Sequence, residues 1–133
     1  FENNVAGIHM GGEWSWGYWL ESAQPKHVEI RNCVFRNNQL DIRFGGQPMD
    51  MAINVASWTN PDQLGRPSET QYGLMRDIRI HDNLFEDEKV CVSLQNCADV
   101  WFWNNRMVNC GQDLSIHDNT TGNINRTAWN PQE

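Results

Sequence analysis

The chain has 133 residues, a length that allows a single domain. Its 17 acidic and 10 basic residues give a formal net charge of −7, which argues against nucleic acid as a partner, because nucleic acid attracts a basic stripe. Hydrophobic residues make up 39% of the chain and charged residues 20%, a balance that argues against a disordered segment. The acidic charge leaves neutral ligands, cationic ligands and metal ions open, and we expect no membrane contact.

A short sequence motif recurs along the chain. In it, alternating apolar and polar residues are followed by Asn or Asp and then by a large apolar residue. The motif occupies residues 28–38, 78–87 and 100–109, and its C-terminal part also occurs at residues 1–4. In each copy another apolar residue follows the large one after seven positions: Phe1 and Ile8, Phe35 and Ile42, Phe85 and Val92, Met107 and Leu114. Fixed spacing inside a repeat, with variable length between repeats, is typical of solenoid proteins.

The alternation has a period of two, which predicts short β-strands with one buried face. We expect these strands around Val28/Ile30, Ile78/Ile80, Val100/Phe102, Ala6–Met10, Leu40–Phe44, Val90–Leu94 and Leu114/Ile116, and a further strand at Met51–Val55 before the second insertion. No stretch carries the apolar stripe of a helix, so helices should be nearly absent. The 22 residues from Phe85 to Met107 fit one coil of a right-handed parallel β-helix.

We therefore predict an all-β fold, a right-handed parallel β-helix of about four to five coils that carries two long loop insertions. Residues 1–133 form one segment, and we expect it to belong to a longer β-helix domain, because no polar cap covers either end. Like residues of stacked coils should form ladders. The inner ladder is Phe1, Phe35, Phe85 and Met107, packed with Ile8, Ile42, Val92 and Leu114, and the turn ladder is Cys33, Asn83 and Asn105.

The four cysteines, Cys33, Cys91, Cys97 and Cys110, lack the spacing of a zinc site. We expect them to be free structural thiols, with Cys91 and Cys110 as the pair to examine first for a disulfide. No residue pattern indicates a metal site, and we expect no cofactor.

Two insertions interrupt the repeats. The first, Gly11–Ser22, gathers Trp14, Trp16 and Trp19 with Glu13 and Glu21. Aromatic rings on a loop can stack on sugars, and neighbouring carboxylates can serve as acid and base. The alternative is that the rings only cover the side of the fold.

The second insertion, Ala56–Arg76, contains Trp58 and is rich in Pro and Gly, which predicts a long loop. It follows Asp41, Arg43 and Asp50 and could form one wall of a cleft. The floor of that cleft would be an outward column of His9, Asp41/Arg43, Cys91/Ser93 and Ser115/His117.

A third group lies on the outward face of the other strands. There Glu29, Arg79 and Trp101 should stack beside Arg31, His81 and Trp103, with an ion pair from Glu29 to Arg79 and a cation–π contact from Arg79 to Trp101. The alternative is a solvated sheet face without a binding role.

The run from Gly12-Glu13 to Trp19-Leu20-Glu21-Ser22, followed by 28–35, resembles the W-x-E-S-G…V-x-I-x-N-N-x-F segment of parallel β-helix glycoside hydrolases. It is most similar to glycoside hydrolase family 110, the α-1,3-galactosidases, and residues 75–85 and 99–105 also resemble that family's C-terminal coils. The resemblance implies a secreted or periplasmic, metal-independent glycosidase that removes terminal sugars, and Glu21 is the residue that matches the family's acid.

These observations favour a glycoside hydrolase that acts on an oligo- or polysaccharide. The expected catalytic residues are Glu21, Asp41, Glu13 and Asp50, and the expected sugar-binding residues are Trp14, Trp16, Trp19, Arg43, His9 and Trp58. A polysaccharide lyase on the same fold, with Ca²⁺, and a non-catalytic glycan-binding or adhesin module are the alternatives. The sugar, the linkage and the oligomeric state stay open.

Overall fold

The structure, a computed structural model, describes residues 1–4, 6–12, 14–15, 19–20, 26–38, 43–44, 47–48, 51–57, 75–95, 97–117 and 124–126. Within these residues every regular element is a β-strand, and the three largest sheets are parallel throughout. The prediction of an all-β chain built on parallel sheets is therefore confirmed.

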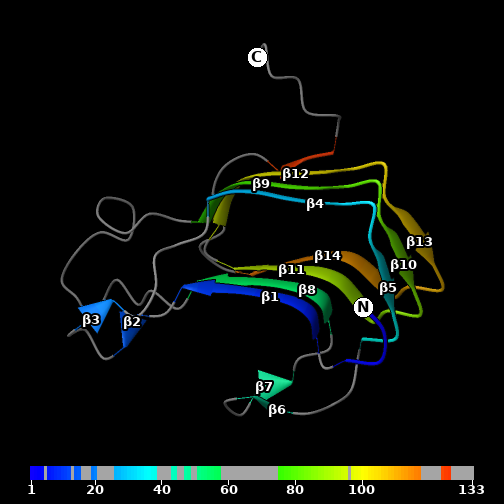
Figure 1. Ribbon diagram of the computed structural model, residues 1–133, viewed down its shortest axis with the longest axis horizontal. Coiled ribbons are helices and arrows are strands. Elements are labelled where there is room, and N and C mark those ends of the chain that lie inside the picture. The colour runs from blue at the N-terminus through cyan, green and yellow to red at the C-terminus, as the bar shows by residue number, and fades with distance from the viewer. Residues whose placement is uncertain are drawn as a thin grey trace.

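Three parallel sheets surround the apolar core, as Figure 1 shows. Sheet 1 contains β4 (Lys26–Arg31), β9 (Met75–His81), β12 (Cys97–Trp103) and β15 (Ile124–Asn125). Sheet 2 contains β5 (Val34–Arg36), β10 (Leu84–Glu86) and β13 (Arg106–Val108). Sheet 3 contains β1 (Ala6–Gly12), β8 (Met51–Ser57), β11 (Val90–Gln95) and β14 (Gln112–Ile116). The chain visits sheets 1, 2 and 3 in turn, and each such passage is called a repeat below.

Two short hairpins stand apart from these sheets. Strands β2 (Trp14–Ser15) and β3 (Trp19–Leu20) pair antiparallel, and so do β6 (Arg43–Phe44) and β7 (Gln47–Pro48). Both hairpins belong to segments that interrupt the repeats, so the repeats themselves supply the parallel strands (Figure 1).

The core follows from the apolar alternation of the strands. In sheet 1, Ile78 lies opposite Val28 on one side and Val100 on the other, and Ile80 lies opposite Ile30 and Phe102. Five of these six residues, all except Val28, are at most 6% exposed. Branched apolar residues on one face of a strand pack well on the pleated surface, which is why this pattern gives strands here.

The inner aromatic ladder is confirmed in its register. The rings of Phe1 and Phe35 stack at a centroid distance of 5.1 Å, those of Phe35 and Phe85 stack at 5.0 Å, and Met107 lies opposite Phe85. Phe35 and Phe85 are completely buried. The prediction that Met107 is a core residue was wrong, since it is 41% exposed: it sits on β13, the last strand of sheet 2 among the described residues.

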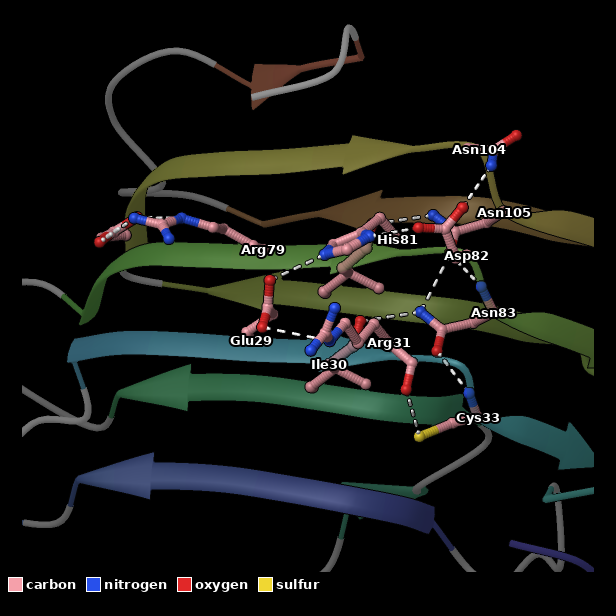
Figure 2. Close-up of polar contacts among 12 residues, drawn as sticks. Glu29, Ile30, Arg31, Cys33, Arg79, His81, Asp82, Asn83, Asn104 and Asn105 are labelled. Carbon is pink, nitrogen blue, oxygen red and sulfur yellow. Dashed lines mark hydrogen bonds and ion pairs between the residues drawn. The ribbon is translucent and has the colours of Figure 1, made fainter. Parts of the chain in front are cut away.

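The polar turn ladder between sheets 1 and 2 is confirmed (Figure 2). Asn105 Oδ1 accepts hydrogen bonds from the backbone N–H and the side-chain amide of Asn83, at 3.2 and 3.0 Å. Asn83 Oδ1 in turn accepts from the backbone N–H of Cys33 at 3.0 Å. The amides of Asn83 and Asn105 also donate to the carbonyls of Ile30 and Ile80. Each amide thus links one repeat to the next.

A residue in the left-handed conformation stands beside each turn ladder. These residues are Asn32, Asp82 and Asn104 between sheets 1 and 2, and Asn3, Asn37, Asp87 and Asn109 before sheet 3. Asn and Asp tolerate this conformation better than other residues with a side chain, so the repeated Asn and Asp of the sequence have a backbone reason.

One predicted strand was wrong. Residues 40–44 were expected to lie in the stack with Ile42 opposite Ile8, but β8 takes that place, with Ile53 opposite both Ile8 and Val92. Ile42 itself lies outside the described residues. The seven-residue spacing fails in this repeat because extra residues fall between the turn at Asn38 and β8, in addition to those between β8 and β9.

A second turn ladder runs between sheets 2 and 3 and contains a buried acid. Asn38 Oδ1 accepts from the backbone and side-chain amides of Asn4, and Asn38 donates from its backbone N–H and side-chain amide to the two carboxylate oxygens of Glu88, at 3.0 and 2.7 Å. Glu88 is only 1% exposed, and burial raises the pKa of its carboxyl, against the hydrogen bonds from Asn38.

Replacement of Asn105 by Leu tests the first ladder. The change leaves two donors of Asn83 and the carbonyl of Ile80 without partners, so the free energy of unfolding should fall by about 1–3 kcal/mol. Urea unfolding measures it. The control is Arg106→Leu at the exposed neighbouring position, which should change stability by about 0.5 kcal/mol or less. Equal losses in both variants would contradict the role of the ladder.

Glu88 should make the stability of the protein depend on pH. Because its pKa is raised in the folded state, that state holds the proton more tightly than the unfolded state. Stability from this group is therefore fully present below the ordinary glutamate pKa and is lost as the pH rises through the raised value. Relative to Glu88→Gln, the wild-type protein should gain stability as the pH is lowered from about 7 to about 4.

Urea unfolding of both proteins at several pH values in this range measures the effect. The variant Glu2→Gln, which changes an exposed carboxylate, is the control and should follow the pH profile of the wild type. If the profile of Glu88→Gln runs parallel to that of the wild type, the buried carboxyl does not titrate as described.

Candidate functional site

Charged and aromatic side chains gather on the outward face of sheet 1. Glu29, Arg79 and Trp101 occupy one column of paired positions. Arg31, His81 and Trp103 occupy the next column. Both columns agree with the sequence prediction. The apolar residues between them point to the core, so the alternation of the strands places all six side chains on one outer face.

His81 makes polar contacts through both of its ring nitrogens (Figure 2). Its Nδ1 lies 2.6 Å from Asp82 Oδ2, and its Nε2 lies 3.1 Å from Glu29 Oε1. The imidazole is 7% exposed and stacks on the indole of Trp103, with ring centroids 4.0 Å apart and an interplanar angle of 9°. The contacts of this one residue join three neighbouring strands.

The two carboxylates hold both nitrogens of the His81 ring. An ionised carboxylate only accepts hydrogen bonds, so a ring nitrogen of His81 takes part in either contact as a donor. The stack on Trp103 fixes the plane of the ring. The second oxygen of each carboxylate is also used, since Arg31 lies 3.4 Å from Glu29 Oε2 and Asn104 donates to Asp82 Oδ1.

The hydrogen bonds between His81 and the two carboxylates shift the pKa values of those carboxylates. They are the largest cause that lowers the pKa of Glu29, with Arg31 adding attraction, and also the largest that lowers the pKa of Asp82, with Asn104 next. Both groups are therefore ionised at neutral pH.

Asp77 forms a second ion-pair group on the same face. Arg79 contacts it with two guanidinium nitrogens, Nε to Oδ1 at 2.9 Å and NH2 to Oδ2 at 2.7 Å, and His27 Nδ1 lies 2.6 Å from Oδ2. Burial raises the pKa of Asp77, but the hydrogen bonds from His27 and Arg79 outweigh it, and the pKa is lowered.

The predicted close ion pair between Glu29 and Arg79 was wrong, because each of the two residues pairs with another partner. Glu29 and Arg79 do lie opposite each other, but the guanidinium turns along its own strand to Asp77, and the carboxylate turns to His81 and Arg31. Arg79 acts on Glu29 only through longer-range attraction. The fork of an arginine favours two-point contact with one carboxylate, and Asp77 offers it two residues away.

Among the described residues of this face, no carboxyl group has the raised pKa of a general acid. Trp101 and Trp103 are partly exposed indoles, and the carboxylates beside them are ionised acceptors. A general acid needs a raised pKa and contact with the substrate. Among the described carboxyls with a shifted pKa, Glu88 alone is raised, and it is buried in a turn between sheets 2 and 3.

Most residues of the predicted site lie outside the described residues. These are the four expected catalytic acids, Glu13, Glu21, Asp41 and Asp50, and the expected sugar-binding residues Trp16 and Trp58. The backbone is described for three further members. Trp14 and Trp19 lie on the paired strands β2 and β3, and Arg43 lies on β6. The first insertion therefore brings two of its tryptophan positions onto one hairpin.

The expected cleft floor on sheet 3 was wrong. His9 lies opposite Asn54, which lies opposite Ser93, so β8 rather than 40–44 continues the column. His9 is exposed and its Nδ1 is 3.0 Å from the amide of Asn54, but Cys91 and Ser93 are 0% and 4% exposed. Because Cys91 and Ser93 are buried, this column does not form the floor of an open cleft.

Asp77 and Asp82 were not predicted from the sequence as members of a site. Asp82 sits at the left-handed position that Asn32 and Asn104 occupy in neighbouring repeats, so its acidic side chain among amides was the available signal. Asp77 has no comparable sequence signal, because its role depends on the side-chain direction of Arg79.

Within the described residues, no group of three or more His, Cys, Asp or Glu side chains is arranged to hold a metal ion. That part of the chain also has no helix with the length and apolar character needed to cross a membrane. Comparisons with protein-family models, with curated proteins and with solved structures gave no match to this chain.

Replacement of His81 by Phe tests the polar network. Phe keeps the stack on Trp103 but removes both ring donors, so the pKa values of Glu29 and Asp82 should rise toward their ordinary values. Carboxyl-carbon NMR titration measures this. The pKa of Asp77, which is held by His27 and Arg79, should stay unchanged and serves as the internal control. Unchanged values for all three carboxyls would show that His81 does not hold the network.

Proposed function

We propose that the chain is a segment of a right-handed parallel β-helix that acts on carbohydrate, as part of a glycoside hydrolase that cleaves terminal, galactoside-like sugars. The repeated order of sheets 1, 2 and 3 supports the β-helix, as do the ladders that join neighbouring repeats. A secreted or periplasmic location agrees with the resemblance to family 110.

The outer face of sheet 1 is the observation that carries the carbohydrate proposal. Trp101 and Trp103 provide apolar ring faces at a fixed spacing of two residues along one strand. Sugars offer apolar faces to such rings and hydroxyl groups to nearby carboxylates. Glu29, Asp77 and Asp82 are held ionised and in place by cationic partners, so they can accept hydrogen bonds from hydroxyl groups without reorganising.

The catalytic acids would come from segments outside the described strands. Because the described carboxylates of the face have lowered pKa values, they suit binding, or a base, better than proton donation. Glu21 or Glu13 of the first insertion is proposed as the acid, and Asp41 or Asp50, which precede the second insertion, as its partner. Paired carboxylates on either side of a glycosidic bond give hydrolysis by acid and base.

Two other functions compete with hydrolysis. A polysaccharide lyase would use an arginine or lysine as its base and usually Ca²⁺, whereas Arg31, Arg76 and Arg79 of this face each have a carboxylate partner. A non-catalytic glycan-binding or adhesin module would use the same aromatic face without any acid. The ion pairs favour the hydrolase over the lyase, and activity measurements separate the hydrolase from the adhesin.

Replacement of Trp101 by Ala should weaken glycan binding by about tenfold, because a stacking surface is lost. Isothermal titration with galacto-oligosaccharides measures the affinity. The control is Val34→Ala, which changes an exposed side chain on sheet 2 and should leave binding unchanged. Equal binding by the Trp101 variant and the wild type, or no binding by either, would contradict the proposed face.

The same substrates separate a hydrolase from an adhesin. In the complete enzyme, Glu21→Gln and Asp41→Asn keep the shape of each side chain and remove its ionisation, so each should lower turnover by about 10²-fold while binding persists. Release of reducing sugar measures turnover, and release of unsaturated sugar would identify a lyase. Undiminished turnover in both variants would place the acid and base elsewhere.

A further inference from the structure

One histidine of sheet 1 has a backbone conformation that otherwise belongs to Asn and Asp. Among the described residues, every non-glycine residue with a positive φ is Asn or Asp except His27, whose φ is 57°. His27 on β4, Asp77 on β9 and Asp99 on β12 all have this conformation, and the register of sheet 1 places them in one column. Since Asn or Asp serves this backbone position elsewhere, the imidazole of His27 is the feature to explain.

The ring of His27 is held at one nitrogen and open at the other. Its Nδ1 lies 2.6 Å from Asp77 Oδ2, and its side chain is 80% exposed. Within the described part of the chain, Nε2 has no hydrogen-bond partner. Arg79 contacts the same carboxylate with two guanidinium nitrogens and so fixes its plane.

This geometry decides which nitrogen of the neutral His27 ring is free. Burial raises the pKa of Asp77, but the hydrogen bonds from His27 and Arg79 outweigh it, and the carboxyl is ionised at neutral pH. An ionised carboxylate only accepts hydrogen bonds, so Nδ1 of His27 is the donor. The neutral ring therefore carries its free lone pair at the exposed Nε2.

A histidine that is oriented by a carboxylate and open at its second nitrogen has the arrangement of a general base. Hydrolysis of a glycosidic bond needs an acid and a base on opposite sides of that bond. Hydrolysis of an ester has a smaller requirement, because one histidine can take a proton from the attacking water and return it to the leaving oxygen. The described residues of this face therefore suit ester hydrolysis.

We propose that His27 is the general base of a second activity, the hydrolysis of acyl esters, with O-acetylated sugars as the substrate class. Nε2 of His27 takes a proton from a water molecule while the water oxygen bonds to the acyl carbon. The sugar oxygen then leaves the tetrahedral intermediate and takes that proton from Nε2. The products are a free sugar hydroxyl and a carboxylic acid, and Asp77 positions the ring throughout.

The sugar part of this substrate rests on the proposed function. Arg79 lies opposite Trp101, so His27 and Asp77 share the outer face of sheet 1 with the indole that would stack on the sugar. The exposed Lys26 precedes His27 on β4 and supplies a positive charge for the acyl oxygen of the intermediate.

Replacement of His27 by Asn tests the base. Asn tolerates the left-handed backbone, so the variant should fold, but it has no nitrogen that can take the proton. With an O-acetylated methyl galactoside as the probe, the rate of acetate release, followed by proton NMR, should fall by about 10²-fold.

The matched control is His117→Asn, which removes an exposed histidine whose Nε2 lies 3.4 Å from the hydroxyl of Ser115 rather than beside a carboxylate. It should release acetate at the wild-type rate. A wild-type rate in the His27 variant, or no release by the wild type above the uncatalysed rate, would overturn the proposal. Acetate and reducing sugar are measured separately, so failure of ester hydrolysis is distinguished from failure of the proposed glycosidase.

Replacement of Asp77 by Asn tests the positioning of the ring. The change keeps the shape of the side chain but removes the charge that holds the proton at Nδ1 of His27, so kcat should fall while KM changes little. Nitrogen-15 NMR at about pH 9, where histidine rings are neutral, reads the tautomer directly. The wild type should hold the proton at Nδ1, and the variant should share it between both nitrogens. A proton at Nε2 in the wild type would contradict the assignment of His27 as the base.

Discussion

Amide side chains inside the turns fix how one repeat lies on the next, and the other features depend on that alignment. A column of Ile, Val and Phe would accept a shift of two residues, because the same face would stay apolar. The same shift would break the hydrogen bonds of Asn83, because its side-chain amide donates to both the carbonyl of Ile30 and Oδ1 of Asn105. A buried polar group without a partner costs about 1–3 kcal/mol, so a shift of the strands would lose several such contacts at once.

The same alignment builds the polar face of sheet 1. Because Glu29, His81 and Trp103 stand at fixed places on three strands, the His81 ring has a carboxylate at Nε2 and an indole stacked against its face. These groups are partly open to water, so their pairing adds less to stability than to the position of each side chain. The result is a surface whose charges are already satisfied and whose aromatic rings are fixed. Such a surface suits the proposed contact with sugar hydroxyls and ring faces.

Much of the fold could be predicted from the sequence, because period-two alternation and repeated Asn and Asp report directly on strands and turns. The seven-residue spacing failed only after Phe35, where the insertion precedes β8, and spacing alone cannot locate an insertion within a repeat. The sequence predicted which residues form the two columns of the candidate site, but not which of their side chains contact one another. Whether Arg79 turns to Glu29 or to Asp77 depends on competition between two nearby carboxylates, which residue order does not resolve.

Backbone contacts between repeats in solution test the central claim most directly. The stacking predicts that strand partners 22 residues apart lie opposite each other in all three sheets, as Ile78 with Val100, Phe85 with Met107, and Val92 with Leu114. Nuclear Overhauser measurements on labelled protein should therefore show parallel-strand contacts at this separation between β9 and β12, between β10 and β13, and between β11 and β14. Antiparallel contacts between these strands, or a different separation in each of these three pairs, would contradict the stacked repeats and with them the polar face.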